Sequence, residues 1–460
     1  MTFRAHGALI ALTLLAGGCA SGPLDDSAWP APRPLGQGLE SIRPPYSPDE
    51  AFEFDSVAEP TGIMSLRDAL AAALLRSPNL MADGYEVRAR EAEALQAGLM
   101  PNPELSAEFE NFGGSGELSG TDKLESTLSL SQLVELGGKR VKRRNVANRE
   151  ARLAGWLYEI RRIDVLSKTA SDYVGLLASE RRLRIAIETQ ELAKRVHNVI
   201  DERVNAGKVS PVERNKAQVE LALAKLGLNQ AQREVMAART RLASNWGSPD
   251  PQFESLVGDL EQLDAPPTLD SLLSRVEQNP DLARWAAESS LRQAEVELAL
   301  SQRRADLTIS GGVRYFEEIN ETAFVAGISM PLMVFDQNQG GIQAARLRVL
   351  QGGHLEEANR VQIRMALVVA FQILDGAYFS VHIIRDEVLP NAERSFEAAE
   401  EAFREGKIGA LDLLDAERTL FEGRRLLTDA LTTYHLAVIA GERLIGAPLH
   451  EEDQPEGIDP

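Results

Sequence analysis

Two aspartates, Asp412 and Asp415, stand three residues apart directly after the turn Gly406-Lys407-Ile408-Gly409. If a helix begins there, this spacing places both carboxylates on one face of its first turns. Two like charges placed in this way would attract cations. The ordinary alternative is negative charge that complements the dipole at a helix start. The residues by themselves leave both interpretations open.

No constellation suited to catalysis accompanies this pair. The six histidines are dispersed without ligand spacing, and no Ser-His-Asp or paired-carboxylate set stands out among the many acidic residues. Gly138-Lys139-Arg140 lacks the earlier glycine and the following Ser or Thr of a phosphate loop, so it indicates a strand-to-helix junction. We therefore expect no enzyme activity, no cofactor and no metal-binding centre.

Composition argues against further classes of protein. Acidic residues outnumber basic ones 69 to 49, the net charge is -20, and such a surface repels nucleic acid. No uninterrupted apolar run of about 18 residues follows the N-terminus, which argues against a helical membrane protein. A single cysteine excludes a disulfide framework and a thiolate metal cluster.

The N-terminus predicts export and a lipid anchor. Arg4 precedes a short apolar stretch at 8–15, and small residues follow, which is typical of a secretory signal peptide over 1–18. The only cysteine, Cys19, comes next, in a pattern that resembles the lipobox of bacterial lipoproteins. We expect Cys19 to be acylated in the outer membrane, unless this is an ordinary signal peptide that happens to contain a cysteine. The proline-rich residues 19–61 predict a lipid-anchored linker.

The rest of the chain reads as two copies of one unit. Ser77-Pro78-Asn79-Leu80 is matched by Asn279-Pro280-Asp281-Leu282 at an offset of 202 residues. Gly207-Lys208-Val209 is matched by Gly406-Lys407-Ile408 at an offset of 199. Because the same offsets recur at further positions, we infer an internal duplication. The expected units are a first repeat over 62–260, a second repeat over 261–447 and an acidic tail over 448–460.

Each copy shows the same order of expected elements. Short helices over 66–76 and 269–278 stop at prolines, and second helices follow over 80–99 and 282–303. Alternating stretches then predict strands with one apolar and one polar face over 105–110, 127–131, 307–315 and 324–330. No proline interrupts the periodic segment between Gly138 and Gly207, which predicts a helical rod on the order of 100 Å long.

Four amphipathic strands are too few to close a barrel, since the smallest membrane barrels have about eight. Open strand edges cannot lie in lipid, where every backbone group needs a partner. Three copies would pool twelve strands and arrange the long helices into a tube. We therefore expect a mainly α fold with a β-barrel portion: a trimeric 12-stranded outer-membrane β-barrel continued by a long periplasmic α-helical barrel.

Over roughly residues 62–447 this layout resembles the TolC-like outer-membrane efflux channels. The first strand hairpin is similar to their heavy-metal cation branch, the CzcC-like components. The motifs that carry the resemblance are Pro101-Asn102-Pro103-Glu104-Leu105, Glu110-Asn111-Phe112-Gly113-Gly114, Leu128-Ser129-Leu130-Ser131-Gln132, Glu135-Leu136-Gly137-Gly138-Lys139-Arg140, Ser310-Gly311-Gly312-Val313-Arg314 and Phe335-Asp336-Gln337-Asn338-Gln339-Gly340-Gly341.

The resemblance implies a homotrimer in the lipid of the bacterial outer membrane that reaches into the periplasm. Its implied partners are a periplasmic adaptor protein and a proton-driven inner-membrane pump of the resistance-nodulation-division class. It further implies that Asp412 and Asp415 line the pore constriction, with six carboxylates around one opening in a trimer. The turns Gly207-Lys208-Val209-Ser210 and Gly406-Lys407-Ile408-Gly409 would form the rim that meets the adaptor.

The resulting hypothesis is an exit duct for divalent heavy-metal cations. One alternative is the same kind of channel exporting drugs or other organic compounds. A second, from another class, is a periplasmic coiled-coil scaffold lipoprotein that never inserts into a membrane. Strands with charge on one face only, at Glu108, Glu110 and Arg314, favour the channel because a scaffold has no need of them.

Overall fold

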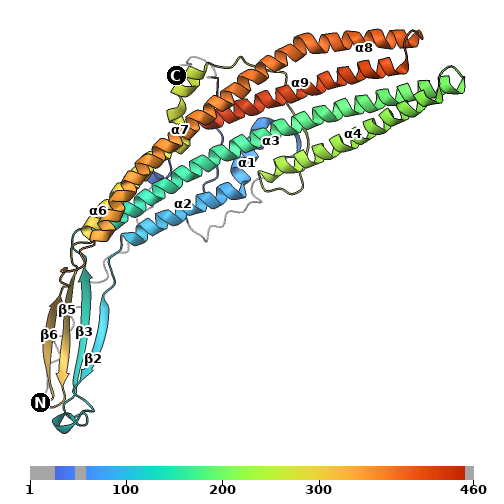
Figure 1. Cartoon of the computed structure of the whole chain (residues 1–460). Coiled ribbons are helices and arrows are strands. Elements are labelled where there is room, and N and C mark those ends of the chain that lie inside the picture. The colour runs from blue at the N-terminus through green and yellow to red at the C-terminus, as the bar shows by residue number, and fades with distance from the viewer. Residues whose placement is uncertain (1–25, 47–58, 451–460) are drawn as a thin grey trace, which may run out of the picture.

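The protein is an elongated arc with a small sheet at one end and two helical hairpin tips at the other (Figure 1). The computed structural model describes residues 26–46 and 59–450. Cys19, the predicted signal peptide and the end of the acidic tail lie outside the described residues.

The first repeat begins with two helices separated by a proline. Ser65 caps the first of them, since its hydroxyl accepts from the Asp68 N–H at 3.3 Å and Asp68 accepts from the Ser65 N–H at 3.0 Å. Pro78 stands at the first position of the second helix, where its missing N–H leaves no helical bond unmade. The elements described up to the end of this repeat are η1 (Asp26–Ala28), β1 (Gly62–Met64), α1 (Leu66–Arg76), α2 (Pro78–Ala97), β2 (Glu104–Glu110), η3 (Gly116–Leu118), β3 (Glu125–Val134), α3 (Lys139–Asn205), α4 (Pro211–Ser244) and β4 (Phe253–Leu256).

The second repeat follows the same order but breaks its long rod. Its elements are α5 (Leu269–Ser274), η4 (Val276–Gln278), α6 (Pro280–Ser301), β5 (Leu307–Phe316), β6 (Glu321–Ser329), α7 (Gln339–Ile383), η5 (Ile384–Val388), α8 (Leu389–Arg404) and α9 (Ala410–Ile445). The break is a π-helical turn, η5, directly before Pro390. Proline has no N–H and its ring crowds the preceding turn, so a wider turn lets the helix continue past it.

The four long strands form one antiparallel sheet in the order β2-β3-β5-β6. Its register puts Leu128 opposite both Ala107 and Val313, and Phe324 follows beside Val313 on the same face. The opposite face is polar, and there Arg314 pairs with Glu125 at 2.8 Å and with Glu110 at 3.1 Å. The predicted division into an apolar and a charged face is therefore confirmed. A short parallel pair, β1 with β4, lies apart from this sheet.

The sheet ends at two open edges. Among the described strands β2 pairs only with β3, and β6 pairs only with β5. Its apolar face is widely exposed, with Phe324 at 93%, Ile328 at 76% and Leu105 at 72% of the possible surface. One chain therefore leaves both a ladder of backbone groups and an apolar surface without partners.

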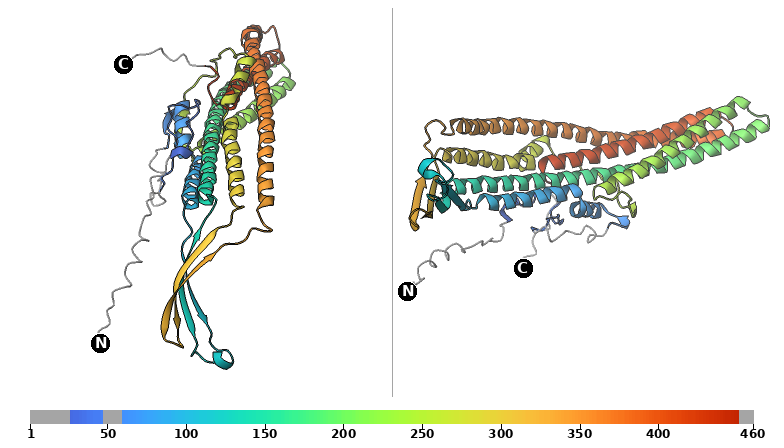
Figure 2. Two further views of the ribbon diagram at one scale, coloured as in Figure 1. Left: turned by 90° about the vertical axis from the view of Figure 1, so that its left-hand side faces the viewer. Right: turned by 90° about the horizontal axis from the view of Figure 1, so that it is seen from below.

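The helices lie four abreast in one curved layer (Figure 2). Near the sheet the order across the layer is α2, α3, α6, α7, and in the far half it is α4, α3, α9, α8. Rows of apolar side chains remain exposed on the outermost helices of this layer. On α4 they are Val212, Val219, Leu223, Leu226 and Met236, and on α7 they include Leu347, Leu350, Val361, Met365, Val369 and Ile373.

Residues 26–46 pack against the first repeat instead of forming a free spacer. Trp29 is buried and donates to Glu91 at 3.2 Å. The Arg33 N–H donates to Glu159 at 2.7 Å, and Arg162 pairs with the same buried carboxylate at 2.8 Å. The proline content therefore indicates an extended backbone in this segment. The aromatic and aliphatic side chains between the prolines pack the segment against α2 and α3.

One part of the composition argument is wrong in the structure. The continuous helix over 339–404 is long and apolar enough, by length and composition, to cross a membrane, and only 28% of its apolar window is buried within the chain. This stretch contains no uninterrupted apolar run because Gln372, Asp375 and Gly376 divide it. Since this helix lies in the layer with α6 and α9, its exposed apolar side indicates packing against another helix.

Candidate gate and docking end

The two hairpin tips are closed by the same backbone motif. Gly207, with φ of 66°, follows α3, and Gly406, with φ of 77°, follows α8. At the first tip the Lys208 N–H donates to Arg203 O at 2.9 Å, and at the second the Lys407 N–H donates to Ala402 O at 2.8 Å. These are Schellman closures, in which a left-handed glycine reverses the chain.

The predicted docking turns lie together at the end of the arc remote from the sheet (Figure 1). Lys208 and Lys407 are exposed on them, while Val209 and Ile408 are half-buried. Ile408 packs onto a cluster that joins the two hairpins through Leu192, Val196, Ile200, Ala217, Phe403, Ala410, Leu413 and Leu414. The tips therefore form one body that presents two lysines outward.

Asp412 and Asp415 lie on the first turns of α9, and both are exposed. The Gly409 N–H donates to the Asp412 carboxylate at 3.0 Å, so Asp412 also closes the N-terminus of the helix. The hydroxyl of Thr419 donates to the backbone O of Asp415 at 2.9 Å. The structure agrees with the interpretation of Asp412 as a helix-start charge. The side chain of Asp415 is exposed to solvent. One chain contributes these two carboxylates.

The equivalent end of the first repeat is capped differently. Ser210 accepts from the Val212 N–H at 3.2 Å through its hydroxyl, where the second repeat has Gly409 and an aspartate. Glu213 and Lys216 stand in place of the two aspartates at the offset of 199 residues, and they pair with each other at 3.9 Å. The acidic pair is therefore particular to the second hairpin.

Next to this end a groove runs between α4 and α9, with α3 as its floor. Its volume is about 1070 Å³. Small residues line the floor, and charged side chains line the walls. The floor includes Gly175, Ser179, Ala186 and Ala193, and the walls include Glu220, Glu234, Arg241, Glu417, Arg418, Glu422, Arg425 and Asp429.

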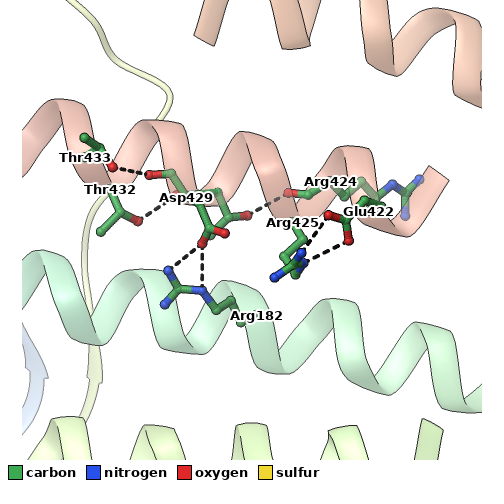
Figure 3. Close-up of polar contacts among 8 residues, drawn as sticks. Arg182, Glu422, Arg424, Arg425, Asp429, Thr432 and Thr433 are labelled. Carbon is green, nitrogen blue, oxygen red and sulfur yellow. Dashed lines mark hydrogen bonds and ion pairs between the residues drawn. The ribbon is translucent and has the colours of Figure 1, made fainter. Parts of the chain in front are cut away.

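Most wall charges are neutralised by close partners (Figure 3). Arg182 on α3 donates to Asp429 on α9 at 2.7 and 3.2 Å. Within α9, Arg425 donates to Glu422 at 2.6 and 3.0 Å. Across the groove, Arg418 pairs with Glu220 on α4 at 2.7 Å. The pairs Arg182–Asp429 and Arg418–Glu220 tie α9 to the first hairpin.

Glu417 differs from these paired residues. It is only 5% exposed, and its Oε2 atom has no hydrogen-bond partner among the described residues. Burial first, and then the nearby charge of Glu220, raises the pKa of Glu417 to about 7. Glu417 was not among the residues predicted from the sequence. One signal for it exists: Glu417 is the charged residue in an otherwise apolar row of α9, between Leu414 and Phe421.

The described residues contain no group of three or more His, Cys, Asp or Glu side chains that could hold a metal ion. His382 and His435 each lie near a backbone carbonyl, at 2.9 Å from Tyr378 O and Leu260 O. Cys19, the predicted lipidation site, lies outside the described residues.

Comparison with protein families gives one description for both halves of the chain. "Outer membrane efflux protein" matches residues 69–248 and 273–447. These two ranges lie within the two repeats that the offsets predict, 62–260 and 261–447.

Curated relatives extend over almost the whole chain. The cobalt-zinc-cadmium resistance protein CzcC of Cupriavidus metallidurans is 32% identical over 418 residues, which cover 90% of this chain and 98% of that protein. The pyoverdine export outer membrane protein OpmQ of Pseudomonas aeruginosa is 26% identical, with 90% of each chain covered.

Solved structures share the fold at lower identity. CusC superposes with a TM-score of 0.69 at 16% identity, covering 89% of this chain and 99% of that one. VceC of Vibrio cholerae gives a TM-score of 0.67 at 17% identity, covering 84% and 97%. The predicted resemblance and fold class, mainly α with a β-barrel portion, are thereby confirmed.

Proposed function

Because the chain belongs to the outer membrane efflux protein family, we propose that it is the exit duct of a proton-driven tripartite system that exports divalent heavy-metal cations. The observation that carries the metal assignment is the match to a cobalt-zinc-cadmium resistance protein over 98% of that protein's length. A nickel-cobalt-cadmium resistance protein of Alcaligenes xylosoxydans xylosoxydans, 27% identical over 61% of this chain, points to the same cargo.

A homotrimer is supported by the unfinished surfaces of one chain. Sheet edges at β2 and β6 need strand partners, and three copies of a four-stranded sheet supply twelve strands. The apolar rows on α4 and α7 lie on opposite margins of the helical layer, so the α4 of one copy can cover the α8 of the next, and its α2 can cover the α7. A head-to-tail contact of this kind closes into a ring.

The remaining partners follow from the position of the tips. With the barrel in outer-membrane lipid, the arc carries both docking turns into the periplasm, where Lys208 and Lys407 would face an adaptor that connects to a resistance-nodulation-division pump. Acylation of Cys19 would add a lipid anchor to the barrel. Asp412 and Asp415 of three copies would then place six carboxylates at one constriction, which favours cations over anions.

The second candidate is export of an organic compound through the same architecture. It is supported by the pyoverdine export protein OpmQ, at 26% identity over 90% of both chains. The two functions differ in cargo and share the duct, so only transport distinguishes them.

The test is a deletion strain of the host that is complemented with the wild-type chain. We expect deletion to lower growth on cobalt, zinc or cadmium salts and complementation to restore it, while tolerance of dyes and hydrophobic antibiotics stays unchanged. Sensitivity to organic compounds alone would overturn the metal assignment and favour the second candidate. A Cys19→Ser chain analysed by mass spectrometry of its N-terminus tests the anchor separately.

A further inference from the structure

Glu417 has the features of a binding group without a ligand in the chain itself. It lines the groove between α4 and α9, it is 5% exposed, and its Oε2 has no partner among the described residues. A buried carboxylate without a compensating partner is costly. The groove has room for water and an ion, with a volume of about 1070 Å³.

The charges around Glu417 come from three helices. Glu220 on α4 lines the same groove, and its like charge raises the pKa of Glu417. Arg195 on α3 and Arg418 on α9 lower this pKa. The arginines do not cancel the effect of burial and of Glu220, because the pKa of Glu417 remains raised, to about 7. A metal cation in the groove would compensate the charge of this buried carboxylate.

We propose that Glu417 and Glu220 form a cation site in the groove between α4 and α9, and that the site takes a hydrated divalent cation. The proposal rests on the proposed function only in one respect: it takes divalent cations to pass through the duct. Asp415 precedes Glu417 by two residues, so the site lies about 3 Å along the helix from it, turned to another face of α9.

The chemistry fits weak, exchangeable binding. Two carboxylates with water in the remaining positions suit a cation that keeps part of its hydration shell. Hard oxygen ligands without Cys or His hold transition metals loosely, which suits a transit site better than a storage site.

Two other acids of the groove are less available than these two. Asp429 is held by Arg182, and Glu422 by Arg425. Glu220 is held through Oε1 by Arg418, but the Arg418 side chain is 65% exposed and can turn to solvent when a cation replaces it. Removing Glu417 should therefore affect binding in the groove more than removing Glu422.

The experiment measures Mn²⁺ binding to the full-length protein in detergent, by electron paramagnetic resonance, for wild type and three variants. We expect Glu417→Gln and Glu220→Gln to weaken binding roughly tenfold or more, since a hydrated cation is held through one or two carboxylates. Glu422→Gln is the matched control and should bind as wild type. Circular dichroism and gel filtration establish that each variant folds; Gln is neutral and similar in size.

A fourth variant, which carries two substitutions, separates this site from the constriction. In Asp412→Asn with Asp415→Asn, the Mn²⁺ signal that depends on Glu417 should persist. Unchanged binding in folded Glu417→Gln would overturn the proposal, even if the host exports metals. Loss of the signal in Glu417→Gln, in a host that exports only organic compounds, would support the site and defeat the proposed function.

Discussion

The two hairpins of this protein derive from one duplicated unit, yet their returning helices have different surroundings. Helix α4 packs mainly on α3 and leaves the row from Val212 to Leu226 exposed. Helix α9 packs between α3 and α8 and buries a second row that contains Leu414 and Glu417. The same periodic pattern therefore produces a central helix in one copy and an edge helix in the other.

This difference shows that a single chain lacks a second neighbour for α4. The repeat equivalent of Glu417 is Gln218, at the offset of 199 residues, and Gln218 is exposed. A neighbouring copy that covers α4 would give this helix the second helix contact that α9 already has within the chain. The asymmetry between the hairpins thus points to assembly, and it places the acidic gate and the buried carboxyl on the same helix.

The largest expected effect is on that assembly. Val219→Asp with Leu226→Asp puts charge into the exposed row of α4, where burial of an unpaired carboxylate is strongly unfavourable. We expect loss of the trimer by light scattering in detergent, with helical content retained. Asn229→Asp with Gln232→Asp, two exposed positions on a different face of the same helix, should leave the trimer intact. A trimer that persists in the first variant would show that the α4 row is not the contact.

The next effect concerns the pH dependence of α9. The pKa of Glu417 is about 7 in the folded protein against an ordinary 4.5, so the folded state binds more protons and loses stability as pH rises between these values. Glu417→Gln removes that loss. We expect amides around residue 417 to exchange hydrogen more slowly in the variant at pH 8, with no difference below pH 4.5. Equal protection at pH 8 would mean that the carboxyl is well solvated.

A smaller and symmetric effect is expected at the tips. Gly207→Ala and Gly406→Ala each force a side chain into the left-handed region, which costs about 1 kcal/mol. Local hydrogen exchange should rise by a similar factor in both hairpins. Gly227→Ala, in the interior of α4, has open space for the added carbon and is the control. A change confined to one tip would contradict the equivalence of the two closures.

Docking can be compared at the same two positions. Photocrosslinkers at Lys208 and Lys407 should both capture the periplasmic adaptor if the tips form one rim. A crosslinker at Arg140, close to the sheet, is the control and should not. Capture from Arg140 alone would reverse the proposed orientation.

Local patterns in the sequence predict much of this fold. Ser65 and Pro78 bracket α1 over the expected residues 66–76, and period-two alternation assigns both faces of the sheet correctly. The burial of Glu417 could not be predicted in the same way, because it depends on α9 lying between α3 and α8. The π turn before Pro390 and the packing of residues 26–46 likewise arise from tertiary contacts.

The candidate gate shows the same limit. Residue spacing predicts that Asp412 and Asp415 share a helix face, and the structure places both, exposed, on the first turns of α9. Whether six of them meet depends on the other two copies, which no pattern within one chain describes. Within one chain Asp412 accepts from the Gly409 N–H and so serves the helix start.

The central claim, a cation-selective duct gated by the second hairpin, is tested most directly by single-channel reversal potential under a salt gradient. The wild-type trimer should favour cations and be blocked by multivalent cations added from the periplasmic side. Asp412→Asn with Asp415→Asn should shift the reversal potential towards zero and relieve the block, since six like charges leave the opening. An unchanged reversal potential and an unchanged block would contradict the account and leave the two aspartates as helix-start charges.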